Sequence, residues 1–225
     1  MSIFVKTVDF CDHLCYDKII QQKGIDLMFK RILIYIISVA MAWAGIGMLL
    51  FLDLGLDPFA SFIMGVSNIT GLSFGTTMLL GQGVFIIPVF WKKRDAIGIG
   101  TVIALLLGGY VIEFFANLWY LIFPAELFLA WRIGLLFVAL IFFAFALAAL
   151  LFADFGIAVY EGLGLAIEEM TNGKFKFKYN RITTDAIATA LGFLFGATVG
   201  IATVATVFLV GPLVDFFKRK LEIVL

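Results

Sequence analysis

Residues 98–115 read GIGTVIALLLGGYVIEFF, and residues 200–217 read GIATVATVFLVGPLVDFF. Eight of these 18 positions are identical when the two stretches are aligned at an offset of 102 residues. Glu113 of the first stretch falls on Asp215 of the second. A shared apolar composition gives some Leu and Val matches by chance, whereas matched Gly, Thr and acidic positions are harder to obtain that way. The chain therefore carries an internal repeat.

The repeat extends upstream of both stretches. A motif of Phe, Asp and Gly at alternate positions occurs twice, 101 residues apart: Phe51-x-Asp53-x-Gly55 and Phe152-x-Asp154-x-Gly156. Each motif precedes a short segment with an apolar stripe at helical spacing, at residues 58–69 and 158–170. We place the two copies of the repeat at residues 28–122 and 129–221.

The composition is that of a membrane protein. Hydrophobic residues make up 63% of the 225 positions and charged residues 14%, with a mean hydropathy of +1.11, whereas soluble domains carry about 25% charged residues. Crossing a bilayer core takes roughly 20 apolar residues in a helix. Six segments approach that length: 31–52, 74–91, 98–122, 129–152, 182–197 and 200–217. The segments 58–69 and 158–170 are too short to cross, so we expect re-entrant or interfacial helices there.

The distribution of basic residues predicts the orientation of the chain. Basic residues cluster at positions 30–31, 92–94, 174–181 and 218–220. The intervening loops at 53–73, 118–131 and 198–199 contain none, so the positive-inside rule places both termini in the cytoplasm. Three crossings per copy is an odd number, so the second copy enters the membrane in the opposite orientation. We expect an all-α membrane protein with six transmembrane helices in two inverted-topology repeats (3+3), each with one short helix.

The N-terminal 27 residues form a polar extension that the topology places in the cytoplasm. Cys11, His13 and Cys15 could bind zinc, but three ligands at this tight spacing are a weak signal, and we predict no metal and no cofactor. The sequence has no Ser-His-Asp set and no nucleotide-binding loop, so we do not expect an enzyme. A formal net charge of zero gives no indication of a nucleic-acid partner.

Glu113 is the strongest candidate for a functional residue. It lies in an apolar run from Ile97 to Phe123, and acidic residues inside membranes are costly and mark ion or substrate pathways by default. Burial would raise the pKa of its carboxyl and permit reversible protonation. The alternative is a structural role, either in an ion pair with Arg132 or in a hydrogen bond to a neighbouring helix.

Other acidic residues recur at matching positions of the two copies. Asp215 matches Glu113, although an ion pair with Lys218 or Arg219 would also explain it. Asp53 and Asp154 end their helices just before glycines, where a negative charge opposes the helix dipole. Each of these two is a candidate gate or cation contact, or simply a solvated loop residue. Asp57 precedes Pro58, which predicts a helix N-cap and a structural role.

Polar residues on the second and fifth spans complete the candidate site. These spans are rich in small residues, which let helices approach closely, so we expect them at the centre of the bundle. The polar positions there are Gln82, Asp185, Thr76, Thr77, Thr183 and Thr184. The threonines could instead bond back to their own helices.

Three stretches of the sequence resemble the YitT/YczE/YyaS group of bacterial integral membrane proteins, over roughly residues 28–221. They are Asp53-Leu-Gly-Leu-Asp-Pro58, Thr70-Gly-Leu-Ser-Phe-Gly-Thr76 and Gly98-Ile-Gly-Thr101. The second copy departs from the first motif, because it has Ala158–Val159 in place of the Asp-Pro pair. The resemblance implies a location in the bacterial cytoplasmic (inner) membrane and supplies no substrate.

The inverted repeat favours a secondary transporter of a small solute or ion, with proton coupling as an option and the site between the two halves, because inverted halves that exchange conformations give alternating access. One alternative is the substrate-binding subunit of an energy-coupling-factor importer, which has a similar length and helix count. Another is a membrane scaffold without transport activity. The expected partners are the lipid bilayer and a small-molecule or ion substrate, and a homodimer stays open.

Overall fold

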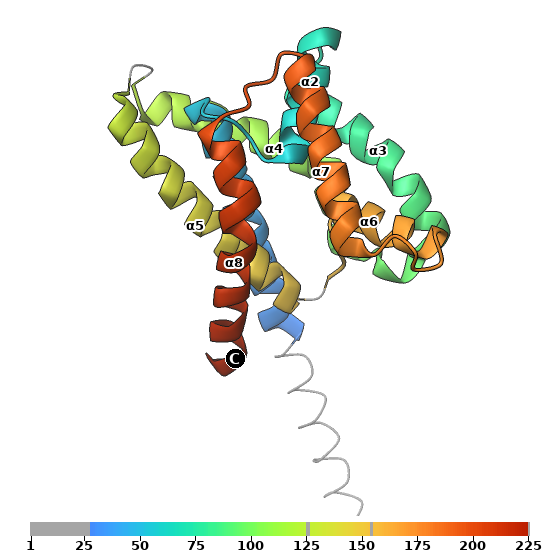
Figure 1. Cartoon of the computed structure of the whole chain (residues 1–225). Helices are drawn as coiled ribbons and strands as arrows, with labels where there is room; N and C mark the ends of the chain where they lie inside the picture. The colour runs from blue at the N-terminus through green and yellow to red at the C-terminus, as the bar shows by residue number, and fades with distance from the viewer. Residues whose placement is uncertain (1–27, 125–126, 154, 225) are drawn as a thin grey trace, which may run out of the picture.

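The computed structural model describes residues 28–124, 127–153 and 155–224. This part of the chain is all-α, with eight helices (Figure 1). The first helix covers Met28–Leu52. The others are α2 (Pro58–Thr70), α3 (Phe74–Lys92), α4 (Ile99–Ile122), α5 (Leu129–Ala153), α6 (Val159–Met170), α7 (Phe177–Leu194) and α8 (Ile201–Val224), with a 3-10 turn at Arg94–Ala96. The 1–27 extension, with Cys11, His13 and Cys15, lies outside the described residues.

Five helices are long and apolar enough to cross a membrane, the pattern of a multi-pass membrane protein. They are Met28–Leu52, Phe74–Lys92, Ile99–Ile122, Leu129–Leu151 and Ile201–Leu221. They confirm five of the six predicted spans. The sixth, at 182–197, corresponds to α7, which is 18 residues long and carries Lys178, Arg181 and Asp185, so its length and composition alone do not mark it as a span.

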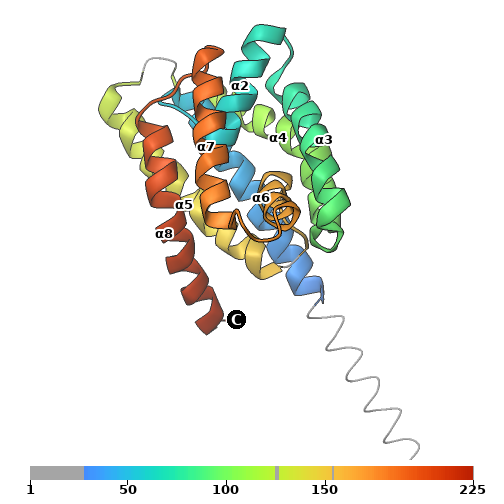
Figure 2. The same ribbon diagram turned by 45° about the vertical axis from the view of Figure 1, so that its right-hand side comes forward.

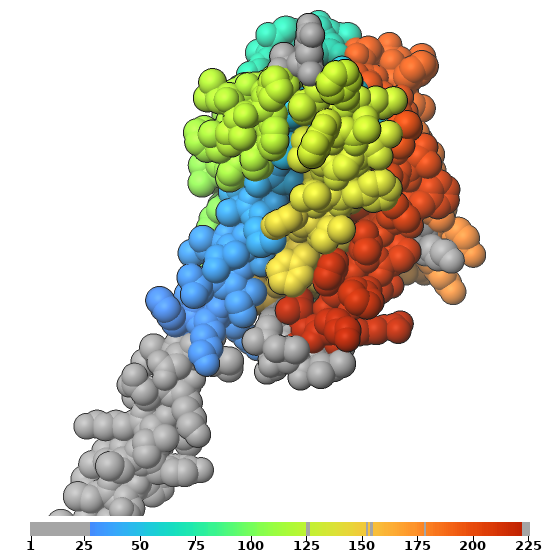
Figure 3. Space-filling model, turned by 90° about the vertical axis from the view of Figure 1, so that its left-hand side faces the viewer, coloured from blue at the N-terminus to red at the C-terminus, as the bar shows by residue number. Residues whose placement is uncertain are grey.

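The two described ends of the chain lie on the same side of the molecule. The first helix starts and α8 ends at the bottom of Figure 1, while α2 lies at the top and α6 lies below it on the right. The first helix, α5 and α8 lie side by side along one face (Figure 3), and α2, α3, α6 and α7 group together beside them (Figure 2).

Each short helix packs on a long helix of the other half of the chain. Helix α2 lies against α7, and α6 lies against α3. Gly192 of α7 approaches the backbone of α2 so closely that an added Cβ would lie 2.5 Å from the Ser61 carbonyl oxygen, and a Cβ on Gly162 of α6 would lie 3.0 Å from Val89 of α3. The absence of side chains at these glycines allows the close contacts.

The two helix pairs, α2 with α7 and α6 with α3, also make side-chain contacts at matching positions near their C-terminal ends. The Asn68 side chain, near the end of α2, donates to the Gly196 carbonyl just beyond α7 at 2.9 Å. Glu169, 101 residues after Asn68, pairs with Lys93 just beyond α3 at 3.2 Å. One contact is therefore a neutral hydrogen bond and the other an ion pair, at opposite ends of the helix group.

In each half, the loop after the first long helix forms a hydrogen bond with the start of the last helix of the other half. The Ala202 N–H donates to the Leu54 carbonyl at 3.0 Å, and the Gly100 N–H donates to the Phe155 carbonyl at 2.9 Å. These two contacts are the same contact made at positions 101 and 102 residues apart.

Gly55 and Gly156 make the loop geometry feasible. Their φ angles are +110° and +106°, a region that L side chains rarely adopt, and both were predicted to terminate helices. An added Cβ would lie 2.6 Å from the Thr203 hydroxyl at Gly55 and 2.6 Å from the Thr101 hydroxyl at Gly156. Each position therefore requires glycine for two reasons: the backbone conformation, and the lack of space for a Cβ atom.

Candidate functional site

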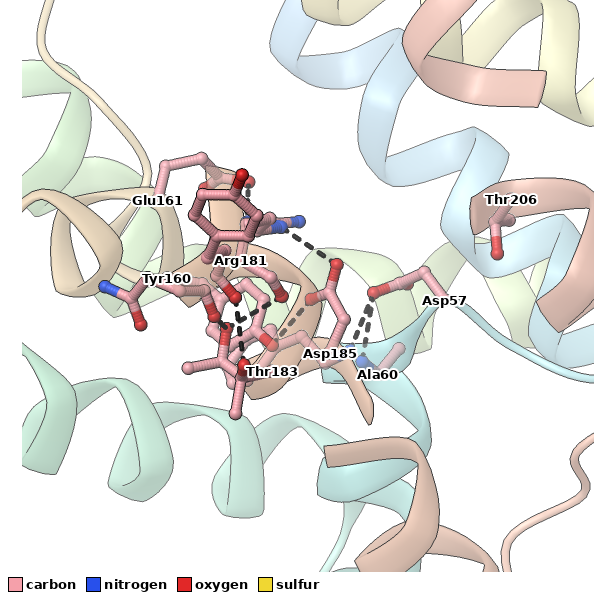
Figure 4. Close-up of polar contacts among 12 residues, drawn as sticks. Asp57, Ala60, Tyr160, Glu161, Arg181, Thr183, Asp185 and Thr206 are labelled. Atoms are coloured by element: carbon pink, nitrogen blue, oxygen red, sulfur yellow. Dashed lines mark hydrogen bonds and ion pairs between the residues drawn. The ribbon is translucent and has the colours of Figure 1, made fainter. Parts of the chain in front are cut away.

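A cluster of charged and hydroxyl side chains lies where α2, α6 and α7 meet (Figure 4). The Tyr160 hydroxyl donates to Asp185 Oδ1 at 2.8 Å. Arg181 donates from Nε to Asp185 Oδ2 and from Nη1 to Glu161, each at 3.1 Å. The guanidinium also lies over the Tyr160 ring, 4.6 Å from its centre. Burial and the neighbouring Asp185 raise the pKa of the Tyr160 hydroxyl, which keeps it protonated as a hydrogen-bond donor.

Asp57 adds a third carboxylate to this cluster. As the sequence predicts, it is the N-cap of α2 with proline at the first helical position, and its Oδ1 accepts the N–H groups of Phe59 and Ala60 at 3.1 Å each. Its other oxygen, Oδ2, is buried and has no hydrogen-bond partner within the described part of the chain. Burial raises the pKa of Asp57 to about 6, against the opposing effects of the Ala60 N–H and of Arg181.

Aromatic rings line one side of the cluster. Tyr160 stacks on Phe59 with ring centres 4.7 Å apart, and Phe85 of α3 lies 5.9 Å from Phe59 and 6.4 Å from Tyr160. Gln82 is buried one turn before Phe85, on the same face of α3. Gln82 is the ninth residue of α3 and Asp185 is the ninth of α7, so two of the predicted site residues occupy the same position on corresponding helices.

Glu113 does not belong to this cluster. Its Oε2 accepts the backbone N–H of Gly75 in the first turn of α3 at 3.0 Å. Arg132, the predicted alternative partner, instead donates to the Leu52 carbonyl at the end of the first helix. Of the two structural roles considered, the hydrogen bond to a neighbouring helix is found, and the carboxylate serves as a cap for α3.

Asp215 and Asp53 also lie apart from the cluster. Asp215 is exposed on α8, in a shallow hollow that Pro212, Phe216 and Arg219 also line. The described ion pairs do not include it. Asp53 is exposed and accepts the Thr198 hydroxyl at 2.6 Å, and Asp154 lies outside the described residues.

The four threonines are largely occupied by local hydrogen bonds. Thr77, Thr183 and Thr184 each donate to a carbonyl of the preceding turn or N-cap, at 2.9–3.0 Å. Thr76 contacts the hydroxyls of Ser73 at 3.1 Å and Tyr110 at 3.4 Å. Of the four, Thr184 lies near enough to the cluster to act on the Tyr160 hydroxyl, whose pKa it lowers. The local bonding follows the alternative that the sequence offered.

Sequence reasoning missed three members of the cluster. Arg181 reads as one more residue of the cytoplasmic basic group, and Glu161 reads as the polar face of an amphipathic helix. Tyr160 falls on the apolar stripe of that same helix. The available signal was spacing: Arg181 and Asp185 are four residues apart on one helix, and a charge pair at that spacing at the start of a predicted span needs explanation.

Comparison with known proteins gives a family without an assigned activity. Searches among curated proteins and among solved structures found no match. A family model described as "Family of unknown function (DUF6198)" matches residues 29–219. That range covers all the described helices except the last residues of α8 and the first residue of the first helix. The chain belongs to the DUF6198 family.

Proposed function

We propose that this protein is a secondary transporter of a small solute or ion, in which two inverted halves alternate access to the Asp57–Tyr160–Glu161–Arg181–Asp185 cluster. The bacterial inner membrane, cytoplasmic termini and kinship with the YitT/YczE/YyaS group are parts of the same proposal. Helix α7 would be the sixth crossing. Its length of about 27 Å suits that role, and Arg181 and Asp185 face protein partners rather than lipid.

The paired contacts support an inverted arrangement of the halves. The short helix of each half packs on the second long helix of the other half, and the loops Leu54–Gly55 and Phe155–Gly156 meet the starts of α8 and α4 in the same way. Two copies that exchange the same contacts reciprocally are related by a two-fold operation. Because each copy has three crossings, that axis would lie in the membrane plane.

One difference between the halves carries the transport proposal. A Cβ on Gly109 of α4 would lie 2.8 Å from the Gly75 carbonyl and from Met78, so α4 packs directly on α3. Gly211, the matching residue of α8, has nothing within 4 Å of the same point. Helices α7 and α8 are not among the closely packed pairs of the described part of the chain, whereas α3 and α4 are.

This difference is what alternating access requires. One half has its second and third long helices closed together, and the other half has them apart. Exchange of the two arrangements would close α8 on α7 and separate α4 from α3, opening the central cluster to the opposite side. The Glu113 contact at the start of α3 would then be lost, and Asp215 would make the matching contact at the start of α7.

Gly211→Leu tests this exchange directly. The purified protein would be placed in liposomes and assayed for uptake of ions, amino acids, thiols and vitamins. We expect the wild type to move at least one solute. Gly211→Leu should fold and bind that solute but lose uptake, because leucine would prevent α8 from closing on α7. The matched control is Gly134→Leu, at an exposed helical glycine of α5 with nothing within 4 Å.

Two results would contradict the proposal. Uptake by Gly211→Leu at the wild-type rate would remove the closing motion. A wild-type protein that moves no solute, and whose thermal unfolding no solute shifts, would favour the scaffold hypothesis. Co-purification with an ATPase would instead favour the importer-subunit hypothesis.

A further inference from the structure

We propose that the carboxylates of Asp57 and Asp185 form a binding site for a small monovalent cation, between the N-terminus of α2 and the middle of α7. The inference rests on the proposed function in taking this cation as the cargo or coupling ion of the transporter. Binding itself is a separate property and is measured without transport.

The first observation is the unpartnered oxygen of Asp57. Oδ1 is fully used by two N–H groups of α2, while Oδ2 is buried without a partner. A buried carboxylate oxygen without a donor calls for an ion or a water molecule to satisfy it. Figure 4 shows the Asp57 side chain beside Asp185, and the charges of Arg181, Asp185 and Glu161 act on its carboxylate, so Asp57 belongs to the cluster.

The second observation is the charge balance. Three carboxylates, those of Asp57, Glu161 and Asp185, surround one guanidinium, that of Arg181. Arg181 already uses its Nε and one Nη in the bonds to Asp185 and Glu161. The positive end of the α2 dipole is equivalent to about half a charge beside Asp57. The cluster therefore keeps a net negative charge, which attracts a cation and disfavours an anion.

The third observation is the nature of the ligands. Carboxylate and hydroxyl oxygens from Asp57, Asp185 and Tyr160 suit a hard cation. The rings of Phe59 and Tyr160 beside them attract positive charge as well. The described residues include no group of three or more Asp, Glu, His or Cys side chains arranged to hold a metal ion. Because the α2 dipole offsets part of the excess negative charge, the proposed occupant is a singly charged ion, either inorganic or a protonated amine.

Protons should compete with the cation at Asp57. The groups that face Asp57 are the N–H groups of its own helix and the side chains of Glu161, Arg181 and Asp185 from α6 and α7. Burial, with smaller contributions from Asp185 and Glu161, raises the pKa of Asp57 to about 6, against the lowering effects of the Ala60 N–H and of Arg181. Cation binding should thus be stronger at pH 7.5 than at pH 5.

The experiment is a thermal-unfolding titration of the purified protein in a buffer whose only other cation is N-methylglucamine. Sodium, lithium, potassium, ammonium and methylammonium chlorides are added separately at constant ionic strength, at pH 7.5 and pH 5. We expect one of them to raise the unfolding midpoint saturably by mass action, more at pH 7.5. A response to sodium, lithium or potassium would indicate an inorganic ion, and a response to ammonium or methylammonium would indicate a protonated amine.

Variants assign the site. Asp57→Asn and Asp185→Asn should remove the cation response, while Asp95→Asn, the same change at an exposed acid of the 94–96 turn, should retain it. Because Asn is an equally good N-cap, Asp57→Asn should still fold. A response that survives both cluster substitutions would overturn the assignment.

The outcomes also separate this inference from the proposed function. If no cation shifts the unfolding of the wild type at either pH, the cation site is wrong. Uptake of some other solute in liposomes would then leave the transporter intact. If a cation stabilises the wild type through Asp57 and Asp185 but no uptake occurs, the cation site stands and the transporter proposal falls.

Discussion

The Glu113 carboxylate on α4 accepts the backbone N–H of Gly75 in the first turn of α3 at 3.0 Å. N–H groups in the first turn of a helix have no partner within that helix, and the positive end of the helix dipole lies there. An acidic side chain within an apolar helix is therefore explained by the neighbouring helix that it caps. Intramembrane position alone made this residue the strongest functional candidate, and the contact gives it a structural role in this arrangement of the helices.

The Glu113–Gly75 contact predicts how substitutions of Glu113 change the stability of the protein. Glu113→Leu leaves the Gly75 N–H without its partner and should lower the free energy of unfolding by about 1–3 kcal/mol. Glu113→Gln keeps an acceptor oxygen and should cost at most about 1 kcal/mol. Thermal unfolding in detergent measures both. If Glu113→Gln had wild-type stability but no longer responded to a bound solute, Glu113 would belong to the site instead.

The matched glycines of α4 and α8 should respond differently to the same small change. Gly109→Ala places a methyl group 2.8 Å from the backbone of α3 and should destabilise the protein by about 1–3 kcal/mol. Gly211→Ala meets no neighbour within 4 Å and should be neutral or stabilising by up to about 1 kcal/mol through helix propensity. Unfolding midpoints of the two variants provide the comparison, and equal losses would argue against the asymmetry.

Alanine at either loop glycine should destabilise the fold. At Gly55 and Gly156 the backbone conformation alone costs on the order of 1–3 kcal/mol for an L side chain, and the added methyl group would also lie 2.6 Å from a threonine hydroxyl. Gly71 also has a positive φ, of +72°, but no atoms lie near its missing Cβ. Gly71→Ala is therefore the control for backbone strain alone, and it should lose less stability in the same assay.

The ion pairs of Arg181 should contribute more to the free energy of unfolding than the Lys93–Glu169 pair. Arg181→Gln leaves Glu161 and Asp185 without their charged donor and should cost about 1–3 kcal/mol. A second change, Glu161→Gln, should recover part of that loss, since the two side chains interact directly. Lys93→Gln breaks the half-exposed pair with Glu169 and should cost about 0–1 kcal/mol. A double-mutant cycle on unfolding free energies tests the ranking, which equal effects would contradict.

Asp57 should make stability depend on pH. Its pKa in the folded protein, about 6, lies above the usual 3.8, so the folded state holds the proton more tightly than the unfolded chain. Stability should fall as pH rises through that window, and the full penalty should be present above it. Asp57→Asn lacks this titration and should exceed the wild type by up to about 3 kcal/mol at pH 7.5 without small cations.

The advantage of Asp57→Asn should shrink to less than about 1 kcal/mol at pH 4, where the folded wild-type carboxyl is largely protonated. Chemical unfolding at the two pH values, with Asp95→Asn as the control, measures this difference. A constant difference between the variants across the pH range would mean that Asp57 does not titrate in this way.

Local chemistry predicted much of the fold. Apolar length identified five long helices, Asp57–Pro58 identified the start of α2, and Gly55 and Gly156 identified the ends of two helices. These features depend on residues close together in sequence, so a single sequence can reveal them. The candidate site depended on contacts between distant segments. Of the predicted site residues that the structure describes, only Asp185 lies in the cluster, with Thr184 at its edge.

The missed residues show why the rest was out of reach. Arg181 lies at the edge of a predicted span beside three basic positions, and nothing local distinguishes it from a lysine that faces lipid headgroups. Its role comes from Glu161, twenty residues earlier on a different helix. Glu113 lies within a long apolar helix, as predicted. Its partner, the Gly75 N–H on α3, is 38 residues away in sequence, and the registry between α3 and α4 decides which N–H the carboxylate reaches.

The loops at Leu54–Gly55 and Phe155–Gly156, each bonded to the other half, have a consequence for how such a chain could arise. Leu54 receives its hydrogen bond from Ala202, and Phe155 receives its own from Gly100, so each half is completed by the other. A chain of half this length would expose those carbonyls and leave its short helix without a surface to cover. It could satisfy them by pairing about a two-fold axis with a second copy of itself. If the two halves are inverted as proposed above, the ancestor before duplication would have been a dimer whose identical subunits inserted in both directions.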